Sequence, residues 1–279
     1  AYLKPIRSRK NLTIITNAQA SKVLFAERKA IGIEYIQAGQ RYSIKAQREV
    51  LLSAGAIQSP QLLQLSGIGP AKLLQEFGIP VLHDSPGVGE NLQDHLQYRL
   101  IYQLNQNIST NVQLSSLLGK VQIGLDWLLF RGGPLSIGIN QGGLFTKVMP
   151  QSKTPDIQFH MATLSADMAG GQVHPFPGFT MSVCQLRPES RGYVRIASPD
   201  PLVPPKMMAN YLSTQHDRDT SVAAVKFARK LAQTGPLKAL IERELKPDNP
   251  QSDDDLLQFC RNNGATIFHP TGTCQMGPD

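Results

Sequence analysis

The sequence predicts an α+β protein in which an antiparallel or mixed sheet carries helices on one face, beside a smaller β-rich region. Two observations support this class. Residues 11–54 contain short β-prone runs separated by charged or glycine-containing turns. From about residue 96, strand-like apolar runs are joined by long connections and followed by helical patterns, which is typical of an antiparallel sheet with helices on one side.

The first 69 residues predict several strands and one turn that leads into a helix. Strands are expected at 12–16, 21–25, 30–36 and 41–45, and the apolar run 50–53 suits a buried strand. Gly55 allows a tight turn after it. Ser59 is expected as the N-cap of the following helix, with Pro60 at its first position and Gly67 at its end.

A bridge follows at residues 70–95. The segment 70–77 predicts a short amphipathic helix that is closed by Gly78. Residues 86–89 form a loop by composition, and a helix with Asn91 and Asp94 in its first turn is expected after it. His95 is expected to be a structural hydrogen-bond partner, because this is the commoner role of a lone histidine after a glycine-rich loop.

The second region, from residue 96, predicts strands at 99–104, 156–160, 180–186 and 192–196. Helices are expected at 115–130 and 217–232, and a third begins after its N-cap Ser252. Three aspartates follow Ser252 and suit the positive end of that helix. Trp127 is expected to pack in the core. The predicted domains are therefore residues 1–95 and 96–279.

Composition narrows the class of protein. The 279 residues are 41% hydrophobic, and no apolar run approaches the length of a membrane span. The net charge is +7, but the lysines and arginines are scattered, which favours a solvated surface over a nucleic-acid interface. A peripheral association with an anionic membrane and a basic, non-enzymatic binding module both stay open. The three separated cysteines predict reduced thiols in a cytoplasmic protein and no metal site.

Six segments, in order along the chain, resemble the glucose–methanol–choline (GMC) family of flavin-dependent alcohol oxidoreductases. The most informative of them is the run Gly55–Gly69, which is similar to a family signature. A helix start of this kind presents backbone N–H groups that suit a phosphate-bearing cofactor. The resemblance extends over essentially the whole chain and is strongest to choline dehydrogenases. The other segments are Asn11–Thr13, Arg48–Ala56, Pro86–His95, Arg187–Val194 and Phe268–Gly277.

The resemblance implies FAD as cofactor and a β-rich first domain that is part of the FAD-binding domain. It places Ala54 and Gly55 at the cofactor, and it places the backbone of a loop near Ala20 against the adenine, with a plain strand or turn alanine as the alternative. It also implies that His269 accepts the hydroxyl proton while hydride passes from the alcohol carbon to the flavin. Imidazole suits this task because its pKa lies near physiological pH.

The substrate is a primary alcohol by the same resemblance, and the product is an aldehyde. Many relatives carry a glutamate where this chain has Asn140, and a neutral amide cannot pair with a quaternary ammonium. Choline is thus the nearest substrate by similarity, with a neutral aliphatic or aromatic alcohol as the alternative. Oxidase and dehydrogenase activity both stay open, as does the electron acceptor.

Family members begin with a Gly-x-Gly-x-x-Gly phosphate loop and end with a further catalytic segment, and neither pattern occurs in this sequence. We therefore expect the chain to be a piece of a longer enzyme. The asparagine or histidine that pairs with the His269 position in the family would then lie beyond Asp279. The piece alone is expected to be inactive and not to retain FAD.

Overall fold

The computed structural model describes residues 2–167 and 170–277, and the chain divides into two compact units. Unit 1 consists of Ala1–Leu92, Arg191–Ala209 and Pro270–Asp279. Unit 2 consists of Gln93–Ser190 and Asn210–His269. The expected division into 1–95 and 96–279 follows chain order, whereas each compact unit is assembled from separate stretches of the chain.

Unit 1 is built on a three-stranded antiparallel sheet in the order β1-β2-β3. These strands match the predicted runs at 21–25, 30–36 and 41–45. The helix predicted at 70–77 is also present, and Gly78 follows it with a φ of +67°. The elements of unit 1 are η1 (Lys4–Ile6), β1 (Ala18–Ala26), β2 (Lys29–Gln37), β3 (Gln40–Lys45), α1 (Gly55–Leu65), β4 (Ile68–Gly69), α2 (Ala71–Glu76), β5 (His83–Asp84), β10 (Tyr193–Arg195) and β11 (Lys206–Met208).

Two predicted strands of this region are wrong. Residues 12–16 and 50–53 form no strand, and Leu51 is 77% exposed. A strand forms only where a neighbouring strand accepts and donates its backbone hydrogen bonds. Within the described residues, no strand pairs with either run. Both runs therefore have the composition of buried strands without the partner that would bury them.

The predicted start of α1 is also wrong. The helix begins at Gly55, with Ala54 at the N-cap position and no side chain capping it. Ser59 and Pro60 consequently lie inside the helix instead of at its start. The glycine, with a φ of +80°, makes the turn into the helix more than one helical turn earlier than the Ser-Pro pair suggests.

The helix expected after the 86–89 loop does not form: Asn91 has a φ of +61°, and no residue of 91–95 is helical. Backbone hydrogen bonds to other stretches of unit 1 hold the beginning of this segment. The Gly89 N–H donates to the Thr273 carbonyl at 2.9 Å, and the Leu92 N–H donates to the Gly192 carbonyl at 3.0 Å. These long-range pairings satisfy the groups that a local helix would have used.

Unit 2 contains an antiparallel sheet of six strands, as predicted. The strand order is β12-β6-β9-β8-β7, and β13 pairs separately with β6. All of these pairings are antiparallel. The strands are β6 (Leu96–Leu104), β7 (Asn140–Thr146), β8 (Ile157–Ala162), β9 (Gly178–Gln185), β12 (Ile241–Lys246) and β13 (Ala265–Thr266).

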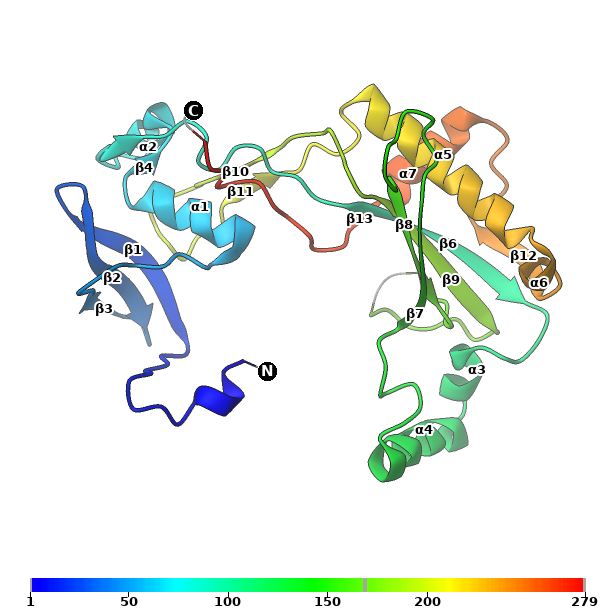
Figure 1. Ribbon diagram of the computed structural model, residues 1–279. Coiled ribbons are helices and arrows are strands. Elements are labelled where there is room, and N and C mark those ends of the chain that lie inside the picture. The colour runs from blue at the N-terminus through cyan, green and yellow to red at the C-terminus, as the bar shows by residue number, and fades with distance from the viewer. Residues whose placement is uncertain (1, 168–169, 278–279) are drawn as a thin grey trace. The chain divides into compact units, whose positions relative to one another are not determined.

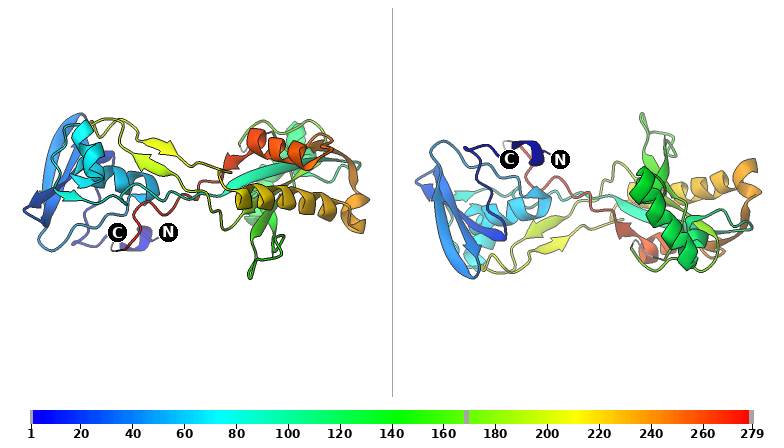
Figure 2. Two further views of the ribbon diagram at one scale, coloured as in Figure 1. Left: turned by 90° about the horizontal axis from the view of Figure 1, so that it is seen from above. Right: turned by 90° about the horizontal axis from the view of Figure 1, so that it is seen from below.

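Helices cover one face of this sheet, which confirms the predicted fold class. Figures 1 and 2 show α5 and α7 side by side along the sheet. Alternate residues of β6, namely Tyr98, Leu100 and Tyr102, pack with α5 residues in the core of unit 2. Thr214 caps α5 and Ser252 caps α7. The helices of unit 2 are α3 (Thr110–Ser115), α4 (Leu117–Phe130), α5 (Gln215–Ala232), α6 (Gly235–Lys238) and α7 (Asp253–Asn263).

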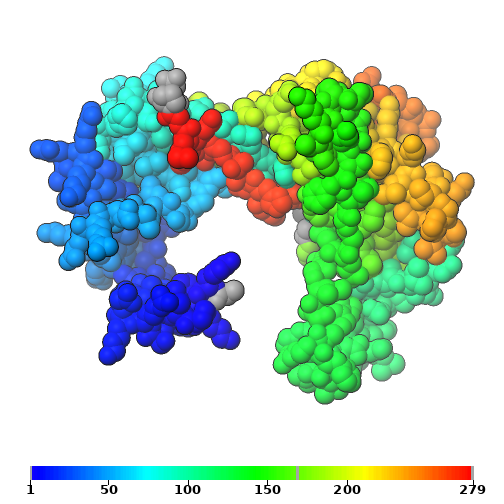
Figure 3. All heavy atoms as spheres, viewed as in Figure 1, coloured from blue at the N-terminus to red at the C-terminus, as the bar shows by residue number. Residues whose placement is uncertain are grey.

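Helix α4 buries little of its apolar surface. Among its residues, Ile123 is buried, whereas Trp127 is 41% exposed and has the Arg131 guanidinium 4.3 Å above its ring. The expected core packing of Trp127 is therefore wrong. In Figure 3 the segment 110–139 stands out from the rest of unit 2. Over the described residues, α4 and every other helix fall short of the length and apolar character needed to cross a membrane.

Candidate active site

His269 lies in an extended segment that follows α7 and is tied to β6. After Gly264 ends the helix, β13 pairs with the first two residues of β6. Phe268 has a φ of +62°, which turns the chain just before the histidine. The His269 backbone N–H donates to Asp94 Oδ1 at 2.9 Å. The position of the imidazole is thus set by a backbone contact to a carboxylate.

Asp94 is buried and accepts hydrogen bonds from three groups. Besides the His269 N–H, the hydroxyls of Tyr211 and Thr266 both donate to its Oδ2. Burial and the nearby carboxylate raise the pKa of Tyr211 to about 12, so this phenol stays protonated and remains a donor. Asp94 therefore connects the start of β6, the segment before α5 and the His269 segment.

The exposed ring of His269 lies against His95. Their ring centroids are 5.4 Å apart in an edge-on arrangement, and their Nδ1 atoms are separated by 3.4 Å. His95 Nε2 lies 3.1 Å from the Leu186 carbonyl oxygen and must donate to it. When both rings are neutral, His95 offers its Nδ1 as an acceptor, so His269 donates from Nδ1 and keeps a lone pair on Nε2.

A third histidine, His160 on β8, completes the cluster. The Gln97 amide nitrogen lies 3.0 Å from His160 Nδ1, which assigns that atom as the acceptor and leaves the proton on Nε2. Burial lowers the pKa of His160, and the charges of His269 and His95 lower it further. Burial and the neighbouring imidazoles therefore both favour the neutral form of His160.

The sheet face opposite the helices is polar and half-buried around this cluster. Strand register places Arg99, Ser182 and His160 in one row across β6, β9 and β8. The next row contains Thr180, Ala162 and Asn140 across β9, β8 and β7. Because side chains alternate along a strand, these residues share one face while Tyr98 and Leu100 face the helices.

A pocket of about 240 Å³ lies on this polar face. It includes the predicted substrate residue Asn140, which is exposed at the start of β7. Gln97 belongs to the pocket and also contacts His160, so the pocket and the histidine cluster are adjacent. The residues that line the pocket are Gln97, Arg99, Ile139, Asn140, Ala162, Leu164, Ala166, Gly170, Gly171, Val173, Thr180 and Ser182.

The residues predicted to hold FAD lie in unit 1. Ala54 and Gly55 are exposed at the N-terminus of α1, whose first backbone N–H groups have no side-chain cap. Apart from the neighbours of Gly55 in the chain and the nearby backbone of its helix, no described residue has an atom within 4 Å of the position that a Gly55 Cβ would occupy. An uncapped, open helix start with a positive dipole end fits a phosphate group.

The loop expected near Ala20 is instead part of β1, because the strand begins at Ala18. Ala20 lies at a bulge where the pairing of β1 with β2 shifts between Ala20 and Lys22. The neighbouring Ser21 hydroxyl donates to Glu34 at 2.8 Å. A bulge interrupts the regular ladder and leaves one residue of the strand unpaired.

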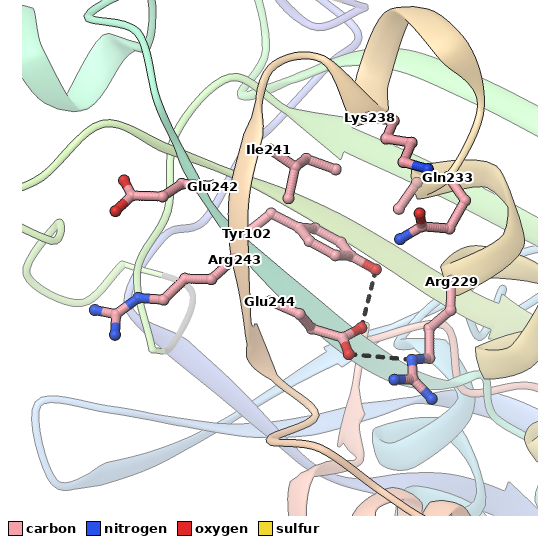
Figure 4. A pocket seen from close by; sticks show the side chains of 9 residues that line it. Tyr102, Arg229, Gln233, Lys238, Ile241, Glu242, Arg243 and Glu244 are labelled. Carbon is pink, nitrogen blue, oxygen red and sulfur yellow. Dashed lines mark hydrogen bonds and ion pairs between the residues drawn. The ribbon is translucent and has the colours of Figure 1, made fainter.

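A second pocket of about 290 Å³ lies in unit 2, between α5, α6 and β12 (Figure 4). Glu244 is at its centre and accepts from the Tyr102 hydroxyl at 3.2 Å and from Arg229 Nε at 3.0 Å. Burial raises the pKa of Glu244, whereas the Arg229 charge opposes this shift. This pocket contacts β6 at Tyr102, near the end of the strand that lies away from the histidines. The charges of Glu244 and Arg229 at its centre neutralise each other.

Sequence reasoning singled out His269 and Asn140, whose roles stay predictions, and it did not single out several residues that lie around them. Asp94 and His95 were expected in structural roles, and Gln97, Arg99 and His160 were not singled out. The alternation of polar and apolar residues in 156–160 does indicate that Gln158 and His160 share the polar face of a strand. The register that places His160 beside Gln97 depends on pairings between distant segments, which alternation alone does not give.

Two models of one family, for its N-terminal and its C-terminal domain, match the chain. The N-terminal model of GMC oxidoreductases matches residues 1–97, and the C-terminal model matches residues 188–279. The two matched ranges cover more than half of the chain, in the family order. The chain belongs to the GMC oxidoreductase family, whose members are FAD-dependent oxidoreductases acting on alcohols.

Curated relatives align with the whole chain. An oxygen-dependent choline dehydrogenase of Cronobacter sakazakii is 38% identical over 281 residues, which cover 100% of this chain and 50% of that protein. An alcohol dehydrogenase [acceptor] of Pseudomonas putida is 38% identical over 283 residues, covering 100% of this chain and 51% of that protein. The chain spans about half the length of the curated relatives it matches.

Solved structures agree on the fold. Pyridoxine 4-oxidase from Mesorbium loti superposes with a TM-score of 0.82 at 26% identity, covering 99% of this chain and 50% of that one. A formate oxidase gives a TM-score of 0.89 at 24% identity, covering 96% of this chain and 52% of that one. At that identity the second match supports the fold alone.

Proposed function

We propose that this chain is part of a longer FAD-dependent alcohol dehydrogenase that oxidises a primary alcohol to an aldehyde. Three observations support the proposal: membership of the GMC family, relatives named as choline and alcohol dehydrogenases, and the exposed imidazole of His269. The observation that carries it is the contact of His269 Nδ1 with His95, because the tautomer of His269 that donates from Nδ1 has Nε2 free to act as a base.

In this proposal, His269 Nε2 takes the proton of the substrate hydroxyl. The electron pair of the O–H bond then forms the carbonyl double bond as hydride leaves the carbon. FAD, when bound, supplies the acceptor for that hydride. His95 holds the tautomer of His269 through Nδ1, and Asp94 holds its backbone. His160 keeps a proton on Nε2, which suits it to donate a hydrogen bond to the substrate oxygen.

Three residues of unit 1 are proposed to hold the cofactor. Ala54 and Gly55 would offer the backbone N–H groups at the start of α1 to a phosphate oxygen. Ala20 would present its backbone at the β1 bulge to the adenine. The fit rests on the uncapped helix start and on the open space at Gly55.

The substrate side of the proposal rests on Asn140 and the pocket that it lines. Choline is the substrate named for several relatives, and other primary alcohols are the alternative. A carboxamide at Asn140 can donate and accept hydrogen bonds but carries no charge for a quaternary ammonium group. The GMC relatives thus define the reaction class, whereas the substrate depends on this chain's own pocket.

The test uses the full-length protein that carries this chain. We expect a purified sample with the absorbance of bound flavin, which a primary alcohol bleaches while the corresponding aldehyde accumulates. His269→Asn should lower the turnover number by roughly 100-fold to 10,000-fold, the usual contribution of a general base, while flavin content is unchanged. His83→Asn, an exposed histidine in unit 1, is the matched control. A flavin-loaded protein that oxidises no alcohol would refute the proposal.

A further inference from the structure

Arg99 is a half-buried cation, and the part of the chain that the structure describes gives it no counter-charge. Within residues 2–167 and 170–277, its guanidinium has no ion pair or hydrogen bond, and removal from water lowers its pKa. Arginine nevertheless stays protonated in proteins. A buried charge is normally paired, because its desolvation is costly. Arg99 therefore keeps five donor groups in a pocket wall without an acceptor among the described residues of this chain.

The rest of the pocket suits an anion better than a cation. Its described lining contains no acidic and no aromatic side chain. A quaternary ammonium group is recognised by carboxylates or by aromatic faces, and the positive Arg99 would repel it. Thr180, Ser182 and Asn140 add neutral hydrogen-bonding groups to the same pocket. The guanidinium fork matches the two oxygens of a carboxylate.

The strand register sets the distance between Arg99 and the histidine cluster. Arg99, Ser182 and His160 are successive members of one cross-strand row. Neighbouring strands are about 4.8 Å apart, so the backbones of Arg99 and His160 are about 10 Å apart. Their side chains extend from the same face. A short molecule can therefore contact the arginine with one end and the histidine cluster with the other.

We propose that Arg99 is a specificity-determining residue that selects alcohols carrying a carboxylate group. The carboxylate binds the Arg99 guanidinium, and the hydroxyl lies toward His160 and His269. This inference rests on the proposed alcohol oxidation and deepens it by naming the substrate class. Under this inference the pocket prefers a negatively charged substrate group. The relatives named as choline dehydrogenases act on a positively charged one.

Binding to the full-length protein that carries this chain, prepared without flavin, tests the inference without turnover. The probes are γ-hydroxybutyrate, its neutral amide γ-hydroxybutyramide, and choline, which are similar in length and differ in charge. Binding is followed by calorimetry and by NMR shifts of pocket amides. We expect γ-hydroxybutyrate to bind at least tenfold more tightly than the amide, and choline more weakly than both. Arg99→Gln should weaken the binding of γ-hydroxybutyrate by roughly tenfold to 100-fold, the range for hydrogen bonds to charged groups.

Two further variants control for folding and for net charge. Arg99→Lys keeps the charge but loses the fork, and should retain part of the preference for the carboxylate. Arg243→Gln removes an equal charge from an exposed position of β12, outside this pocket, and should leave binding of the three probes unchanged. Equal affinity for all three probes, or unchanged carboxylate binding in a folded Arg99→Gln, overturns the inference. Carboxylate selection in a full-length protein that oxidises no alcohol would refute the proposed reaction instead.

Discussion

The Thr273 hydroxyl donates a hydrogen bond to the Ala56 carbonyl oxygen at 2.5 Å. In an uninterrupted helix, that carbonyl would accept from the N–H four residues later, but this residue is Pro60 and has no N–H. Thr273 is fully buried and lies in the C-terminal segment of unit 1. The segment that follows His269 thus supplies the donor that α1 lacks.

Thr273→Val should destabilise unit 1 by about 1–3 kcal/mol, because the Ala56 carbonyl loses its donor in a buried place. Urea unfolding followed by circular dichroism measures this change. Thr13→Val, at an exposed position outside any helix or strand, is the matched control and should be nearly neutral.

A double-mutant cycle sharpens this test. Pro60→Ala restores a backbone N–H that can donate to the Ala56 carbonyl, so Thr273→Val should cost less in the Pro60→Ala background. If Thr273→Val costs the same free energy in both backgrounds, the hydroxyl does not act as the substitute donor.

Asp94→Asn should release the His269 segment. The amide that replaces the carboxylate loses the charge and one acceptor oxygen, while the donors from Tyr211, Thr266 and the His269 backbone remain. We expect a loss of stability of about 2–3 kcal/mol, against about 1 kcal/mol for Tyr211→Phe, which removes a single hydrogen bond.

The same variant has a spectroscopic signature. The pKa of Tyr211, raised to about 12 by burial and by Asp94, should fall toward its ordinary value in Asp94→Asn. Ultraviolet titration of the tyrosines measures it. An unchanged Tyr211 titration together with wild-type stability would show that the carboxylate does not organise this segment.

The His160 pKa predicts how stability depends on pH. Burial, with the charges of His269 and His95, holds this pKa below its ordinary value of 6.5. As the pH falls below 6.5, the unfolded chain binds a proton at this position before the folded chain does. The free energy of unfolding should therefore decrease from the ordinary histidine pKa down to the pKa of folded His160, and not above this window.

NMR titration of the histidine rings measures the His160 pKa directly. His269→Ala removes one of the repelling charges, so the His160 pKa should rise while burial still keeps it below 6.5. His83→Ala, in unit 1, should leave it unchanged. A His160 pKa at or above the ordinary histidine value in the wild-type chain would contradict the described cluster.

Local signals were sufficient for much of the fold. The N-caps Thr214 and Ser252 begin long amphipathic helices whose apolar faces pack on the sheet, and the alternating runs predicted the strands β6, β8 and β9. In these elements propensity, capping and burial agree, so each can be deduced from its own residues.

The sequence predictions were wrong where contacts with distant segments of the chain determine the local structure. Ser59-Pro60 looks like a helix start, but Thr273 makes Pro60 tolerable inside α1. Asp94 looks like a first-turn helix residue, but it binds groups more than 100 positions away. The residue types of the site were visible in the sequence, whereas the pairing of His160 with Gln97 required the register of the sheet.

The central claim is that His269 accepts the proton during alcohol oxidation. The most direct measurement is the rate of flavin reduction by a primary alcohol, without oxygen, in the full-length protein and its His269→Gln variant. We predict that the variant binds flavin normally and is reduced roughly 100-fold to 10,000-fold more slowly, without the rise in rate that deprotonation of an imidazole gives the wild type. A variant reduced at the wild-type rate, with the same pH dependence, would contradict the claim.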